Sequence, residues 1–129
     1  MKSLFIDTNI AIDLIGGDEG IARSLGGFER VYISTFVEGE FLTGIRNTAK
    51  GSVCRRSWER LMLLPTVERI HPTSETAEIY ARLMQSLKDA GTPLPTNDVW
   101  IAAHVLENGS TLFTRDRHFS AIGALRTIA

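Results

Sequence analysis

The sequence predicts an α/β fold: one domain with a mostly parallel central sheet of four to five strands and helices on both faces. Two observations support this prediction. Short apolar runs of strand length alternate with longer segments whose apolar residues recur at helical spacing. Strands separated by helices are joined by right-handed crossovers, so they run parallel and the sheet is covered on both faces. Because 129 residues suffice for one core but not for two, we expect a single domain over residues 1–129.

The individual elements are placed by apolar runs and by the signals that end them. Each strand candidate is a short apolar run, and most helix candidates end at glycine, proline or asparagine–glycine. The last helix candidate is apolar on most sides, which predicts that it is buried. Strands are expected over residues 4–6, 31–33, 67–70, 111–114 and 125–128, and helices over residues 10–15, 19–25, 36–46, 53–64, 75–89 and 98–106.

The composition is typical of a soluble globular protein. Hydrophobic residues make up 43% of the chain, charged residues 22%, and the formal net charge is −1. Cys54 is the only cysteine, which excludes an internal disulfide and a cysteine-rich zinc site. The N-terminus does not resemble a signal peptide, and no apolar run approaches the roughly 20 residues of a membrane span. We therefore expect a cytoplasmic protein with no membrane association.

Three aspartates lie at one edge of the predicted sheet. Asp7 follows the first strand, Asp116 lies just after the fourth, and Asp98 begins the buried helix. Ligands of open parallel sheets bind beyond the carboxyl ends of the strands, so these side chains are candidates for a shared site. Each also has an ordinary explanation, because aspartate near a helix start commonly caps free N–H groups.

A fourth acid lies on the helix that follows the second strand. At about 100° per residue, Glu40 projects between Phe36 and Gly44 into an apolar sector of this helix. The same geometry does not exclude Glu38, which lies between Leu42 and Ile45. Helical periodicity therefore leaves both glutamates as candidates.

Four carboxylates gathered in one small volume would require a cation, because they would otherwise repel one another and become protonated. Ligands that are all oxygen suit Mg²⁺ or Mn²⁺ and disfavour zinc. Such ions can activate a water molecule and neutralise the charge that develops on a phosphodiester. The acid pattern therefore favours nuclease chemistry.

A basic segment and two arginines beside Asp116 are candidate RNA contacts. Residues 46–60 contain five basic side chains, opposed by Glu59 alone. Such a segment either contacts a phosphate backbone or forms a solvated helix face, and the sequence leaves both interpretations open. The expected RNA contacts are Arg46, Arg55, Arg56, Arg115 and Arg117.

Two other classes of α/β protein with acids at strand ends do not fit. A phosphoacceptor receiver domain needs a lysine after a late strand, and the lysines here are Lys2, Lys50 and Lys88. A haloacid-dehalogenase-type phosphatase needs a second aspartate two residues after the first, to act as general acid, and Asn9 occupies that position. Neither class therefore accounts for the acid pattern.

The acids occur in four segments with a recognisable order and spacing. These segments are residues 5–9 (FIDTN), 33–44, 91–104 and 109–119. Together they resemble the PIN (PilT N-terminal) domain family, and specifically its VapC-type toxin ribonucleases of type II toxin–antitoxin systems. The separation of Glu40 from Ser34 in this resemblance selects Glu40 over Glu38.

The resemblance implies a metal-dependent endoribonuclease that hydrolyses RNA and works as a homodimer. It further implies a cognate antitoxin that inserts a C-terminal segment, often with an arginine, into the acidic pocket. Two alternatives remain: a PIN nuclease of general RNA processing, and a non-catalytic RNA- or protein-binding PIN-like module. The implied ligands of Mg²⁺ or Mn²⁺ are Asp7, Glu40, Asp98 and Asp116, and the residues implied to orient the acids or the water are Thr8, Asn9 and Thr114.

Overall fold

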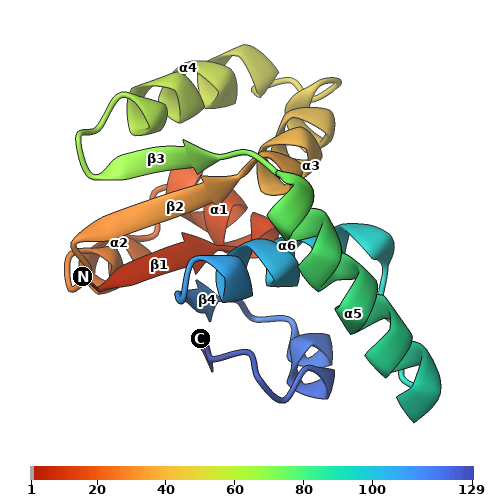
Figure 1. Cartoon of the computed structure of the whole chain (residues 1–129). Helices are drawn as coiled ribbons and strands as arrows, with labels where there is room; N and C mark the ends of the chain where they lie inside the picture. The colour runs from red at the N-terminus through yellow and green to blue at the C-terminus, as the bar shows by residue number, and fades with distance from the viewer. Residues whose placement is uncertain (1) are drawn as a thin grey trace.

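The computed structural model describes residues 2–129, and its centre is a five-stranded sheet (Figure 1). The strands lie in the order β3-β2-β1-β4-β5, and every neighbouring pair is parallel. This arrangement confirms the parallel sheet predicted from the sequence. The strands are β1 (Ser3–Ile6), β2 (Arg30–Ser34), β3 (Val67–Ile70), β4 (Thr111–Phe113) and β5 (Thr127–Ile128).

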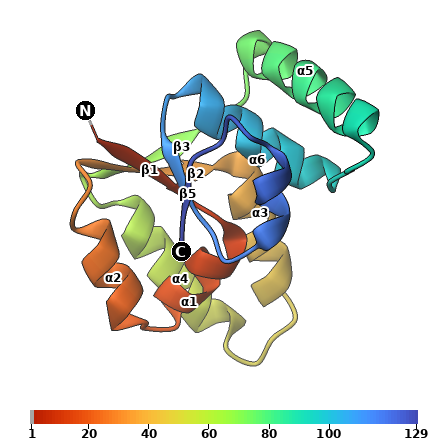
Figure 2. The same cartoon turned by 90° about the horizontal axis from the view of Figure 1, so that it is seen from below.

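Six α-helices connect the strands, each close to its predicted position. They are α1 (Thr8–Ile15), α2 (Glu19–Leu25), α3 (Thr35–Ile45), α4 (Gly51–Met62), α5 (Ser74–Ala90) and α6 (Thr96–Glu107). α1, α2 and α4 lie on one side of the sheet and α5 and α6 on the other (Figure 1; Figure 2). α3 contacts α1, α4 and α6 near the end of β2. None of the helices within residues 2–129 is long and apolar enough to cross a membrane.

The buried core fixes the segments that carry the acids. β1 is the central strand, and its residues Leu4, Phe5 and Ile6 are fully buried because the sheet is covered on both faces. α6 is buried along residues 101–105, as its apolar sequence predicted. This packing holds the carboxyl ends of β1 and β4 and the start of α6 in fixed positions.

Two local features differ from the sequence prediction. α6 begins at Thr96 rather than at Asp98, because Pro95 with φ of −54° at the N-cap leads directly into the helix. Asp98 therefore lies inside the first turn. A short 3₁₀ helix, η1 (Arg117–Ala121), joins β4 to β5 where the sequence predicts no helix, because five residues are too few to show a periodic pattern.

Candidate active site

The pairing of β1 with β4 places Asp7 beside Thr114. Ile6 is paired with Phe113, so the next residue of each strand also lies at the shared carboxyl edge. The Thr114 hydroxyl donates a hydrogen bond of 2.6 Å to Oδ2 of Asp7, and the backbone N–H of Thr8 donates one of 2.9 Å to Oδ1. Asp7 is only 5% exposed. Both of its carboxylate oxygens are therefore held in fixed positions.

Glu40 reaches this site from α3. The Thr8 hydroxyl donates a hydrogen bond of 2.6 Å to Oε1 of Glu40, so one residue contacts two of the predicted acids. Glu38 points elsewhere: Trp58 Nε1 donates to it at 2.9 Å, and Arg69 donates to both of its oxygens. The bond from Arg69 is the main reason that the pKa of Glu38 lies below its ordinary value. Glu40, selected by the family resemblance, is thus the glutamate that lies beside Asp7.

Asp116 joins the same network through Thr114. Its backbone N–H donates to the Thr114 hydroxyl oxygen at 3.0 Å, and its Oδ1 accepts from the backbone N–H of His118 at 2.9 Å. Nδ1 of His118 lies 2.9 Å from the same oxygen. Asp7 and Asp116 therefore cap α1 and η1 while they also face the site, so their ordinary capping role and membership of the cluster coexist.

Asp98 is coupled to the other three acids through its charge. Its pKa is raised to about 6, mainly by burial and then by the negative charges of Asp7, Asp116 and Glu40. Burial also raises the pKa of Asp7, although hydrogen bonds from Thr114 and Thr8 act in the opposite direction. The structure thus brings the four predicted acids into one mutually repelling group.

The acids nevertheless do not form a preassembled metal site. Within residues 2–129, no three histidine, cysteine, aspartate or glutamate side chains are placed so that together they could hold one metal ion. Oδ1 of Asn9 is buried and has no hydrogen-bond partner among the described residues. Asn9, predicted to orient the acids or the water, therefore has an unused buried acceptor at the start of α1.

The candidate RNA contacts separate into groups. Arg115 is bound to α1 and the loop after it, because its guanidinium pairs with Asp13 and lies 3.8 Å from Asp18. Arg117 lines a cavity together with Thr114 and Asp116, beside the acids. A second cavity, between α3 and α4, is lined by two of the other predicted arginines, Arg46 and Arg55, but not by Arg56. Their roles in RNA binding stay predictions.

A further cavity beside Glu40 was not anticipated from the sequence. It measures about 550 Å³ and includes Phe36, Thr43 and Asn97 among its lining residues. Phe36 and Thr43 lie on the same face of α3 as Glu40, at helical spacings of four and three residues. Asn97 directly precedes Asp98. Two signals in the sequence could have identified these residues: helical spacing from Glu40 for Phe36 and Thr43, and the position next to Asp98 for Asn97.

Comparison with known proteins identifies the family. Residues 4–125 match the family model of the PIN domain. The chain belongs to the PIN domain family. This PIN domain is similar to Ribonuclease VapC1 of Haemophilus influenzae (strain R2866), with 27% identity over 116 residues, or 86% of this chain and 84% of the relative. It is also similar to Ribonuclease VapC4 of Mycobacterium tuberculosis (strain ATCC 25618 / H37Rv), with 25% identity over 96 residues, or 74% of each chain.

Solved structures share the fold of this PIN domain over nearly its whole length. VapBC-1 from nontypeable Haemophilus influenzae gives a TM-score of 0.84 at 26% identity and covers 98% of this chain and 96% of that one. VapBC2 from Rickettsia felis, solved with a DNA fragment from its promoter, gives a TM-score of 0.88 at 22% identity and covers 98% and 97%. The resemblance predicted from the four sequence segments is therefore confirmed for this PIN domain.

The raised pKa of Asp98 predicts how a variant changes stability with pH. An acid whose pKa is higher in the folded state stabilises the fold below its unfolded pKa of about 3.8 and loses that contribution as pH rises through about 6. In EDTA at pH 8, Asp98→Asn is expected to raise the free energy of unfolding, because it removes a charge that burial and the neighbouring acids disfavour. Solvent screens this partly exposed side chain, which limits the expected gain to about 1 kcal/mol. The gain is expected to vanish at pH 4. Urea denaturation at both pH values checks this, and equal stabilities at pH 8 would contradict it.

Proposed function

We propose that this PIN domain is a metal-dependent endoribonuclease and the toxin of a VapBC-type toxin–antitoxin pair. The observation that carries the proposal is the hydrogen-bond network through which Thr8 joins Asp7 to Glu40 and Thr114 joins Asp7 to Asp116. Similarity to relatives named Ribonuclease VapC1 and Ribonuclease VapC4 supports the same activity. RNA is the proposed substrate.

The chemistry of the donor set supports Mg²⁺ or Mn²⁺ as the cofactor. The site offers carboxylate oxygens, which are the ligands these hard cations prefer. Burial is the main reason that the pKa values of Asp7 and Asp98 are raised, and the neighbouring acids add to the shift, so a bound cation would favour the charged forms of both groups. We propose Asp7, Asp98, Asp116 and Glu40 as the ligands. When bound, the ion would supply an activated water and neutralise negative charge on the phosphodiester.

The residues around the four acids orient the carboxylates and do not themselves react with the RNA. Donors at Thr8 and Thr114 fix both oxygens of Asp7, so its lone pairs keep a constant direction. The Thr8 hydroxyl holds Glu40 in the same way, and the His118 N–H holds Asp116. This arrangement provides preorganised negative charge for a cation-dependent hydrolysis of the RNA backbone.

The proposed partners are a cognate antitoxin and a second copy of the chain. A structural neighbour from Mycobacterium tuberculosis, VapBC-5, is a member of the VapBC family of toxin–antitoxin systems, which supports the first partner. Four mutually repelling carboxylates also create a demand for positive charge that an antitoxin arginine would meet. The homodimer and the cytoplasmic location rest on the family resemblance.

A matched pair of glutamate variants tests the proposed site. Glu40→Gln is expected to lower kcat/KM for single-stranded RNA by at least about a hundredfold, because it removes a charge from the acid cluster. Glu38→Gln is expected to leave cleavage within about twofold and to cost about 1–2 kcal/mol in unfolding free energy, because it weakens the paired bonds from Arg69. Cleavage of RNA with Mg²⁺ is measured for both, with DNA of the same sequence as the control. Equal activity of the two variants would contradict the assignment of Glu40.

A further inference from the structure

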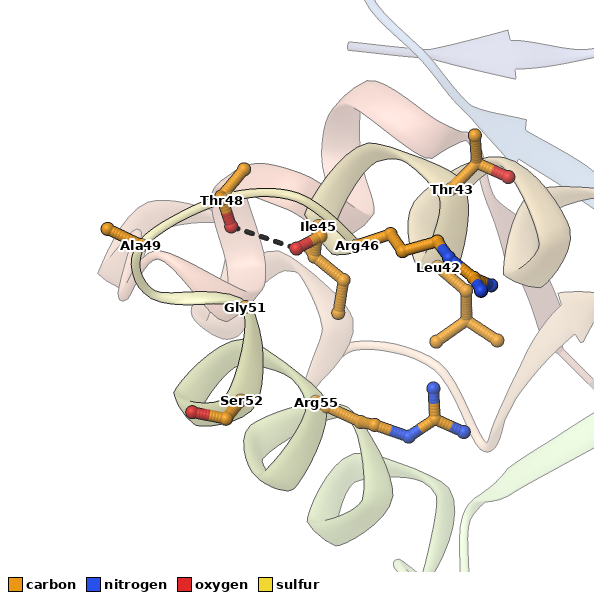
Figure 3. A pocket seen from close by; sticks show the side chains of 9 residues that line it. All are labelled: Leu42, Thr43, Ile45, Arg46, Thr48, Ala49, Gly51, Ser52 and Arg55. Atoms are coloured by element: carbon orange, nitrogen blue, oxygen red, sulfur yellow. Dashed lines mark hydrogen bonds between the residues drawn. The ribbon is translucent and has the colours of Figure 1, made fainter.

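A cavity of about 680 Å³ lies between the C-terminal end of α3 and the start of α4 (Figure 3). We refer to it as the α3–α4 cavity. Arg46, which follows α3, and Arg55 of α4 extend to the same side of it, past Leu42. None of the residues that line it is acidic. The α3–α4 cavity therefore presents two guanidinium groups without an opposing carboxylate in its lining.

Both guanidinium groups are available to a ligand. Within residues 2–129, Arg46 has no carboxylate at ion-pair distance. Arg55 pairs with Glu59, with Nε 3.4 Å from Oε1, and the two side chains are 60% and 62% exposed. An exposed pair of this kind contributes at most about 1 kcal/mol, so a phosphate can displace Glu59 at little cost. Arg69 and Arg115, by contrast, are held by acids on other elements.

A ridge on α3 connects the α3–α4 cavity to the candidate active site. Glu40, Thr43 and Arg46 follow one another at three-residue spacing and so form one row along the helix. Thr43 lines both the α3–α4 cavity and the cavity that contains Glu40. At about 1.5 Å per residue, the ridge spans about 9 Å between Glu40 and Arg46. An extended ligand that lies on this ridge reaches both cavities.

We propose that the RNA strand runs from the four acids along this α3 ridge and that Arg46 and Arg55 bind one of its phosphates in the α3–α4 cavity. The proposal rests on the proposed function and adds to it the path of the substrate. Planar guanidinium groups match the geometry of phosphate oxygens. A protein with a formal net charge of −1 and an acidic site needs local positive charge to hold a polyanion. An acidic peptide would also bind two guanidinium groups, but continuity with Glu40 favours RNA.

Two charge-matched double variants test this path. Arg46→Ala with Arg55→Ala removes both cavity arginines, whereas Arg23→Ala with Arg82→Ala removes two exposed charges, from α2 and α5, that do not line the cavity. The probe is a fluorescein-labelled oligouridylate of about twelve nucleotides, titrated in EDTA at several salt concentrations. The cavity variant is expected to bind about tenfold more weakly and to lose about 0.7 to 1.4 from the slope of log K against log salt. The control variant is expected to stay within about threefold of the wild type.

The outcomes separate the strand path from the activity. Equal affinities and equal slopes for the two double variants would overturn the proposal. Unchanged RNA binding together with lost binding of polyglutamate would also overturn it, because the cavity would then select an acidic peptide. Cleavage with Mg²⁺ is measured separately: if no protein cleaved the RNA, the proposed function would fail, while the slopes measured in EDTA would still decide whether the cavity binds a phosphate.

Discussion

Replacing Asp7 by asparagine is expected to abolish RNA cleavage, with a loss of at least about a thousandfold in kcat/KM. Asp7 accepts hydrogen bonds at both oxygens and is nearly fully buried, so it is the most constrained of the four acids. The amide keeps the shape of the side chain and one acceptor for the Thr8 N–H, but it lacks the charge that the proposed cation needs. The loss is measured with purified protein, single-stranded RNA and Mg²⁺.

The Asp7→Asn protein is expected to remain folded. Burial already disfavours the charged form of Asp7, as its raised pKa indicates, so removal of that charge should leave the free energy of unfolding in EDTA unchanged or slightly higher. Asp89→Asn is the matched control, because Asp89 lies at the exposed end of α5 and its side chain accepts a hydrogen bond from Gln85 of the same helix. Wild-type cleavage by a folded Asp7→Asn protein would remove Asp7 from the active site.

Mg²⁺ or Mn²⁺ is expected to stabilise the wild-type protein against thermal unfolding. At a concentration about a hundredfold above Kd, binding to the folded state alone adds about 2.7 kcal/mol, or several degrees in Tm. The physical reason is that a bound cation would offset the burial and the repulsion among the acids, which together raise the pKa of Asp98 to about 6. Because protons compete with the metal for Asp98, the stabilisation should be larger at pH 8 than at pH 5. Circular dichroism melting curves measure both effects.

Asp98→Asn provides the control for this metal effect. The variant has lost one proposed ligand and part of the repulsion, so its Tm should respond much less to Mn²⁺ than that of the wild type. KCl at the same ionic strength accounts for simple screening of charge. Equal shifts for the variant and the wild type, or an equal shift with KCl, would argue against a metal bound by the acid cluster.

The fold and most of the acid cluster could be predicted because their signals are local. The apolar run of β1 and the apolar surface of α6 are visible within a few residues, and both elements are buried as expected. Asp7 directly follows β1, and Asp98 lies in the first turn of α6. Parallel strand order then brings their carboxyl-edge positions together without further information.

Choices between neighbouring residues could not be made from local patterns. Glu38 and Glu40 occupy the same helix, and what separates them is the contact of Glu38 with Trp58 and Arg69, which lie on α4 and β3. Similarly, Arg115 is held by Asp13 of α1, which lies far away in the sequence. Such pairings depend on tertiary structure, so helical periodicity and charge runs do not contain them.

RNA cleavage by a single preparation of the wild-type protein, first in EDTA and then after excess Mg²⁺ is added back, tests the central claim most directly. We expect no cleavage in EDTA and full recovery with Mg²⁺, because in the proposed mechanism the four acids bind the cation that acts on the phosphodiester. Undiminished cleavage in EDTA that the Asp7→Asn variant also shows would contradict a metal-dependent carboxylate site.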